Sequence, residues 1–286
     1  MDTSIKTIEI QDGVNGYVDL VQHVLKHGEE VAPRGMKTRE IEDATIHIHD
    51  IRAALPLNVN RNPVSGIGAV EALQLLSGVS IPELVIDIGP QFKNYIEDDG
   101  MFHGSYGTRT KGQYEIIIER LKRDPDTRQG VITMWSPQLD TQENKRDYPC
   151  TVLHQFRIRK NKLNMSVYMR SNDVWLGAAY DFFQFSRAQL AICSILQIEP
   201  GTYSHHVGSL HIYADHYEAA EGLKYTDKVE ANPEITGRTW REVESSALIA
   251  LKAVYQTELR DRLTPAERWY TDVMAKAIEN NKKKEQ

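Results

Sequence analysis

The chain has 286 residues, of which 41% are hydrophobic, and its formal net charge at pH 7 is −6. This composition excludes wholesale disorder, and the acidic balance argues against a nucleic-acid coat, because duplex binding uses a basic face. Two cysteines are too few for a disulfide scaffold, and no apolar run approaches the roughly 20 residues of a membrane span. Residues 1–13 are polar and unlike a secretion signal. We therefore expect a cytoplasmic protein that binds neither membrane nor nucleic acid stably.

The first half of the chain predicts helices around one strand. Apolar residues recur at helical spacing in three segments, over residues 15–28, 66–77 and 111–123. A residue that ends helices closes or follows each of them: Gly28, Gly78 and the Asp124-Pro125 pair. Between the first two segments, residues 41–51 (IEDATIHIHDI) alternate apolar and polar side chains, a pattern typical of a strand.

The middle of the chain predicts strands and one long helix. Three short β-like runs cover residues 130–136, 152–160 and 162–170, and Asn161 between the last two predicts a hairpin. Residues 176–197 carry apolar side chains on most faces, as a buried helix does. Residues 201–223 predict a strand, a turn at Gly208, and a second strand that leads into a helix.

From about residue 225 the chain is helical in pattern and strongly charged. No repeat and no linker-like composition separates this segment from the rest. The elements therefore predict one α/β domain over residues 1–286, built on a large sheet.

Cys150 is the first candidate for chemistry. It follows Pro149, which favours extended or turn backbone before the thiol. A cysteine nucleophile reacts as the thiolate, which needs nearby cations such as Arg170 or Arg128. The alternative is a buried, unreactive thiol, and we expect that of Cys193 inside the apolar helix.

A second candidate is a phosphate site. Arginine forks bind phosphate bidentately and a serine hydroxyl adds a donor. The candidates are Arg34, Arg128, Arg170 and Ser171. Any one of these arginines alone is typical of a solvated surface, so only the set is informative.

Asp181 and a group of histidines are the remaining candidates. Asp181 lies early in the apolar helix, where a carboxylate needs a partner, and it could instead cap the helix or pair with an arginine. His211 and Tyr213 share a strand face and could hydrogen-bond a sugar hydroxyl. No cysteine joins the nearby histidines and their spacing fits no standard zinc pattern, so we expect no metal. These histidines are His205, His206, His211 and His216.

Together these motifs resemble thymidylate synthase and its hydroxymethylase relatives, from about Arg34 to Ala220. The matching stretches, in chain order, are Pro33-Arg34-Gly35, Glu71 in EALQLLSG, Gly104-Ser105-Tyr106-Gly107, DPDTR ending at Arg128, Pro149-Cys150, RSNDVWLG with Asp173, and GSLHIY with His211 and Tyr213. The resemblance implies a thymidylate synthase-like fold of α/β (α+β) class: a large mixed sheet packed by helices, with one sheet face at a homodimer interface.

The resemblance also implies a reaction. In this family a cysteine thiolate adds to C6 of a pyrimidine 5′-monophosphate, and C5 then attacks the methylene of 5,10-methylenetetrahydrofolate. Loss of tetrahydrofolate leaves an exocyclic methylene on the base. Hydride from the folate converts it to a methyl group, whereas water converts it to a hydroxymethyl group.

Three residues take catalytic roles by this resemblance. Cys150 is the nucleophile, Glu71 organises water for proton transfer, and Tyr106 assists removal of the C5 proton. Asp173 contacts the folate, with Phe92 and Tyr95 as rough counterparts of the synthase's folate-contacting tryptophans.

The resemblance also assigns residues that bind the phosphate and the sugar of the nucleotide. The phosphate ligands are Arg34, Arg128, Arg170 and Ser171, with Arg128 donated by the partner subunit of a homodimer. His211 and Tyr213 hold the sugar 3′ hydroxyl.

The departures from the synthase bear on the base. The synthase has asparagine where this chain has Asp181, and an amide matches O4 and N3–H of uracil. A carboxyl group can accept from the 4-amino group of cytosine and, when protonated, donate to N3. A mismatched edge leaves buried polar groups unpaired, which discriminates strongly. Thr151 replaces a histidine that helps to order water near O4 of uracil. Both changes point to a cytosine nucleotide.

Other departures bear on the phosphate and the product. Gln129 replaces the second arginine of the synthase's pair, and Lys145 or Arg146 could compensate. The chain ends in KKKEQ, without the short apolar segment that closes over folate in the synthase. A poorly shielded methylene is more open to water than to hydride, so we expect hydroxymethylation.

The sequence therefore predicts a folate-dependent enzyme that makes a 5-hydroxymethylcytosine nucleotide from dCMP or CMP. The alternatives are a C5-methylating enzyme, either a dCMP methylase or a thymidylate synthase, and a non-catalytic relative that binds nucleotide or RNA.

Overall fold

A computed structural model describes residues 6–56, 65–142 and 144–284. The described strands form one mixed sheet in the order β1-β3-β8-β6-β5-β4, with β2 beside β3 and β7 beside β8. Their bounds are β1 Thr7–Asp12, β2 Glu29–Val31, β3 Thr38–Asp50, β4 Gly130–Thr133, β5 Thr151–Arg159, β6 Lys162–Met169, β7 Asn172–Asp173 and β8 Glu199–Tyr213. Strands β1, β6 and β7 run parallel to their neighbours β3, β8 and β8, while the other pairs are antiparallel. The predicted large mixed sheet is confirmed.

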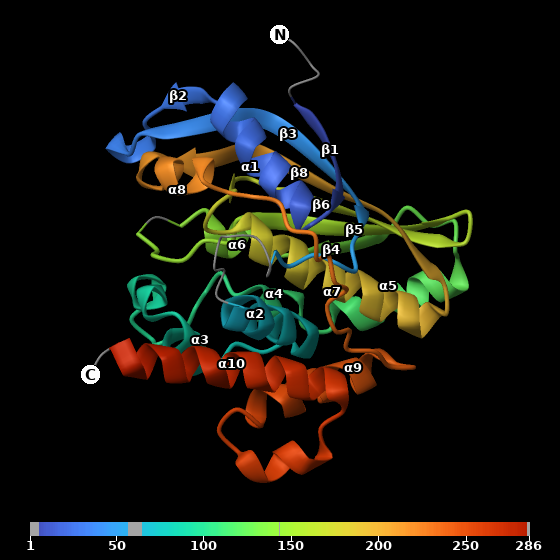
Figure 1. Cartoon of the computed structure of the whole chain (residues 1–286). Helices are drawn as coiled ribbons and strands as arrows, with labels where there is room; N and C mark the ends of the chain where they lie inside the picture. Colours follow the sequence, from blue (N-terminus) through green and yellow to red (C-terminus); the bar gives the residue numbers. More distant parts are fainter. Residues whose placement is uncertain (1–5, 57–64, 143, 285–286) are drawn as a thin grey trace.

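Helices pack on one face of this sheet (Figure 1). Helix α7 lies against the sheet, α2 packs on α7, and α9 and α10 pack on α2. The α-helices are α1 Asn15–His27, α2 Ser65–Ser77, α3 Pro82–Ile88, α4 Tyr106–Thr110, α5 Gln113–Arg123, α6 Pro137–Asp140, α7 Ala178–Leu196, α8 Tyr217–Glu221, α9 Trp240–Lys252 and α10 Pro265–Lys284. Short 3₁₀ turns are Pro33–Gly35, Pro90–Tyr95, Ala214–His216 and Thr257–Arg262. No helix among the described residues is long and apolar enough to cross a membrane.

The two faces of the sheet differ in character because side chains alternate along each strand. On β8, Tyr203 and His205 are fully buried toward α7, where Phe182 contacts both rings. On the opposite face, Thr202 and Ser204 line a shallow pocket together with Asn164 of β6. One face is thus the core, and the other is polar and open to a pocket.

The predicted hairpin and the long buried helix are confirmed, but the predicted turn at Gly208 is wrong. β8 runs without interruption from Glu199 to Tyr213. A Cβ on Gly208 would lie 2.8 Å from the carbonyl oxygen of Arg170. The glycine is therefore explained by a close approach of two backbones, and this approach brings the segment after β6 against β8.

Candidate active site

The β5–β6 hairpin places Cys150 beside Arg170. Cys150 immediately precedes β5 and Arg170 immediately follows β6, and antiparallel pairing sets the two ends side by side, with Arg170 N donating to Cys150 O at 2.9 Å. The Arg170 guanidinium lies 3.5 Å from Cys150 Sγ, and the Ser171 hydroxyl lies 3.9 Å from it. Arg170 also donates to the carbonyl of Pro149 at 3.1 Å, which holds the fork in place.

The thiol is only partly exposed, and its surroundings act on its pKa in opposite directions. Burial raises the pKa of Cys150 above its ordinary value, while the charge of Arg170 and the Ser171 hydroxyl lower it. The nearby carboxyl of Asp181 raises it again. For Cys193, burial outweighs the charge of Arg52 and raises the pKa to about 12. The geometry thus gives Cys150, and not Cys193, the contacts that can stabilise a thiolate.

Asp181 occupies the first turn of α7 and faces the same site. Asn172 Nδ2 donates to its Oδ2 at 2.7 Å, and Gln184 Nε2 donates to its Oδ1 at 3.1 Å. Burial raises the pKa of Asp181 to about 7, although the two amide donors act to lower it. The carboxyl therefore changes protonation state near neutral pH.

Glu71 and Tyr106 reach this cluster from two other helices. Glu71 of α2 accepts from Gln184 Nε2 at 3.3 Å, and burial followed by the Asp181 charge raises its pKa to about 8. Tyr106 opens α4 and packs against Phe185 of α7. Burial raises its pKa well above the ordinary phenol value, and the charges of Asp181 and Cys150 add to this. Two carboxyls, a phenol and a thiol thus lie close enough to act on one another's pKa.

Comparison of the sequence with known proteins identifies a family. The sequence model of thymidylate synthase matches residues 15–261, most of the chain. The chain belongs to the thymidylate synthase family. It is also 31% identical over 231 residues to a deoxyuridylate hydroxymethyltransferase of Bacillus phage SP01. That alignment covers 75% of this chain and 59% of the relative, so the chain spans less than two thirds of that protein's length.

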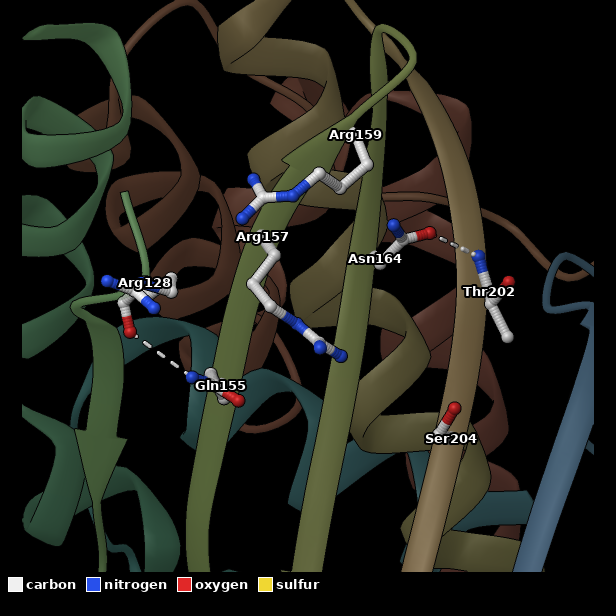
Figure 2. Close-up of a pocket in the computed structure, with 7 residues that line it drawn as sticks. All are labelled: Arg128, Gln155, Arg157, Arg159, Asn164, Thr202 and Ser204. Atoms are coloured by element: carbon white, nitrogen blue, oxygen red, sulfur yellow. Dashed lines mark hydrogen bonds between the residues drawn. The ribbon is translucent and has the colours of Figure 1, made fainter. Parts of the chain in front are cut away.

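Within this thymidylate synthase-family protein, the four residues predicted for phosphate do not lie together. Arg170 and Ser171 adjoin Cys150, but Arg128 lies in the pocket on the opposite face of the sheet, beside Arg157 and Arg159 (Figure 2). Neither Arg170 nor Ser171 lines that pocket. Arg34 is exposed in the turn before β3, with a left-handed φ of 54°.

The two predicted substitutes for the missing second arginine are engaged elsewhere. Lys145 lies 4.0 Å from the buried Asp140, and Arg146 pairs with Asp98 at 2.8 Å. The arginines that accompany Arg128 are instead Arg157 and Arg159, which the motif comparison missed. Their alternation along β5 was the available signal, since residues two apart point to the same face.

Asp173 has one carboxylate oxygen that is hydrogen-bonded and one that is not. Its Oδ1 accepts from the backbone N–H groups of Trp175 and Leu176 at 2.7 and 2.9 Å. Its Oδ2 is buried and has no hydrogen-bond partner in the part of the chain that the structure describes. Burial raises the pKa of Asp173. A buried acceptor without a partner fits an N–H group such as a pterin carries. Phe92 is partly buried and Tyr95 is exposed, 6.4 Å apart between ring centroids.

The histidines separate into different surroundings. The His211 and Tyr213 rings lie 5.3 Å apart at the end of β8. His206 stacks on Tyr168, and His216 stacks on Trp175. The described residues contain no group of three or more histidine, cysteine, aspartate or glutamate side chains that could hold a metal ion. Asn172, Gln184 and His205, by contrast, gather around Asp181, and sequence analysis gave none of them a role.

Proposed function

We propose that the protein transfers a one-carbon unit to C5 of a cytosine 5′-monophosphate and releases the 5-hydroxymethyl nucleotide. When bound, 5,10-methylenetetrahydrofolate supplies that unit. Cys150 attacks C6, and Arg170 and Ser171 stabilise its thiolate and hold the phosphate. Glu71 and Tyr106 handle the protons at the ring, Asp173 accepts from the folate, and His211 with Tyr213 binds the sugar.

The observation that carries the choice of base is the state of Asp181. A carboxyl group with a pKa of about 7 can be protonated at neutral pH. It then offers one oxygen as an acceptor for the 4-amino group of cytosine and one proton for N3. Uracil presents the reverse pattern, a carbonyl oxygen and an N3–H. The ionised form of Asp181, which is also populated near pH 7, has no donor for that oxygen and repels it, but it still accepts from the 4-amino group of cytosine.

A second candidate is hydroxymethylation of dUMP. The relative from Bacillus phage SP01 is named for that reaction. This similarity supports water, rather than hydride, as the final reactant in the present protein as well. Hydroxymethylation of dUMP does not, however, account for Asp181. CMP in place of dCMP, a C5-methylated product and a non-catalytic nucleotide-binding protein remain the other outcomes that the assay must separate.

We also propose that the active form is a homodimer joined through the polar face of the sheet. Arg128 lies on that face, away from the Cys150 of its own chain. Two copies placed face to face would carry Arg128 of one subunit toward the phosphate of the other, as the family resemblance implies.

Tritium release from C5-labelled CMP, dCMP and dUMP, with methylenetetrahydrofolate present, tests the proposal. We expect release from a cytosine nucleotide. Release from dUMP alone would make the base assignment wrong, and no release from any of the three would favour a binding protein. Mass spectrometry of the product distinguishes a hydroxymethyl from a methyl group, and an absorbance change from dihydrofolate accompanies only methylation.

A further inference from the structure

A buried chain of hydrogen bonds runs from β8 to the base-facing carboxyl. Tyr203 Oη lies 3.0 Å from His205 Nδ1, and His205 Nε2 lies 3.1 Å from Asn172 Oδ1. Asn172 Nδ2 then donates to Asp181 Oδ2 at 2.7 Å. All four side chains are buried, and we call Tyr203, His205 and Asn172 the relay.

The hydrogen bonds of the relay are favourable in only one direction of donation, from Tyr203 toward Asp181. Burial lowers the pKa of His205 to about 3, so the ring is neutral and carries one N–H. Burial raises the pKa of Tyr203 far above neutrality, so its hydroxyl always has a proton to donate. If Tyr203 donates to Nδ1, the histidine proton is on Nε2, and Asn172 must turn its oxygen to His205 and its NH₂ to Asp181.

The reverse direction leaves a buried donor without a partner. A flipped Asn172 would donate to Nε2, and the proton on Nδ1 would point at Tyr203 Oη. The phenol would then need another acceptor, but His205 is its one hydrogen-bond partner among the described residues. A buried hydroxyl that finds no acceptor is unfavourable. The relay therefore fixes Asn172 as a donor toward position 181.

Gln184 adds a second donor on the other side. Its Nε2 faces Asp181 Oδ1 and is also shared with Glu71. The side chain at position 181 thus lies between two NH₂ groups: that of Asn172 faces Oδ2, and that of Gln184 faces Oδ1. A carboxyl satisfies both donors. An amide at this position would satisfy one and turn its own NH₂ against the other.

We propose that Asn172, oriented by His205 and Tyr203, is a specificity-determining positioning residue that makes position 181 accept a carboxyl and reject an amide. This inference rests on the proposed function, in which residue 181 reads the base. It follows that uracil recognition requires residues 172 and 181 to change together. In the double substitution Asn172→Asp with Asp181→Asn, the new carboxylate accepts from both His205 and the new amide, and Gln184 donates to the amide oxygen.

A double-mutant cycle over these two positions tests the proposal. The kcat/KM values for dCMP and dUMP are measured by tritium release for the wild type, Asp181→Asn, Asn172→Asp and the double variant. We expect Asp181→Asn to lose dCMP turnover with little gain on dUMP. The double variant should exceed Asp181→Asn on dUMP by about tenfold or more, the effect of one satisfied buried hydrogen bond.

A milder set of variants avoids a second charge change. Tyr203→Phe removes the hydroxyl that pairs with His205 Nδ1. Nδ1 then has no partner among the described residues in either ring tautomer, so the phenol no longer favours the Nε2–H form, and Asn172 can flip and accept from an amide at 181. Combined with Asp181→Asn, it should also raise dUMP turnover. Tyr114→Phe is the matched control, because Tyr114 is equally buried and faces a different histidine, His154, at 3.5 Å. It should leave the base preference of Asp181→Asn unchanged.

The outcomes separate this inference from the proposed function. If Asp181→Asn alone acquires full dUMP activity and the residue 172 change adds nothing, the relay does not set specificity, although residue 181 still reads the base. If Asp181→Asn alters neither substrate, residue 181 does not read the base and the base assignment fails. Nitrogen-15 NMR of His205 is a readout independent of turnover: a proton on Nδ1 in the wild type overturns the relay, and a proton on Nε2 supports it.

Discussion

At the scale of single residues, the pKa of Cys150 predicts its reactivity. Because burial raises this pKa above the ordinary value, the thiol is mostly protonated at neutral pH, and alkylation by iodoacetamide should speed up as pH rises through 9. Arg170→Met removes the cation 3.5 Å from Sγ and should slow alkylation at fixed pH by about tenfold. We expect an effect at the lower end of the range for a charge in contact with the thiol, because Arg170 is exposed and solvent screens its charge.

The control for this experiment is the other cysteine. Cys193 is buried and burial raises its pKa to about 12, so Cys150→Ser should abolish rapid labelling. An unchanged pH profile in Arg170→Met would show that the guanidinium does not act on the thiol.

Glu71 predicts a pH dependence of stability. Its pKa is raised from 4.5 to about 8 in the folded protein, so folding favours the protonated form. The stability that this group contributes is fully present below pH 4.5 and is lost as pH rises toward 8. Glu71→Gln imitates the protonated form. Its free energy of unfolding should rise relative to that of the wild type by at most about 1.4 kcal/mol for each pH unit in this window. Urea unfolding at several pH values measures it, and parallel curves for the two proteins would contradict it.

At the scale of elements, Gly208 joins β8 to the segment that carries Arg170. A methyl group there would meet the Arg170 carbonyl oxygen at 2.8 Å, so Gly208→Ala should push this segment away from β8. We expect the free energy of unfolding to fall by about 1–3 kcal/mol, as for overpacking. Displacement of Arg170 should also raise KM for the nucleotide. Gly222→Ala is the control, since the nearest atom to its Cβ lies 3.5 Å away. A normal KM in Gly208→Ala would mean that this contact does not position Arg170.

Local patterns predicted most elements, and long-range pairing accounts for what they missed. The helices and the β5–β6 hairpin follow from periodicity and turn residues close in sequence. Gly208 was misread because a glycine permits a turn and a close backbone approach equally well. Cys150, Arg170 and Asp181 were found as motif residues. Asn172 and His205 lie 33 residues apart in the sequence and meet in the folded sheet, and no local pattern reports that contact.

At the scale of the whole molecule, the polar sheet face predicts a shared active site. If Arg128 serves the partner's phosphate, Cys150→Ser and Arg128→Glu disable different halves of one composite site. Each variant alone should be inactive. A heterodimer of the two has one site with both intact residues, so unfolding and refolding an equal mixture should restore about a quarter of wild-type activity by random pairing. Mixing Cys150→Ser with Glu71→Gln is the matched control, because these residues share a site within one chain and no pairing rebuilds it. Recovery in the first mixture alone requires Arg128 to act across the interface, whereas no recovery in either places its role within its own subunit.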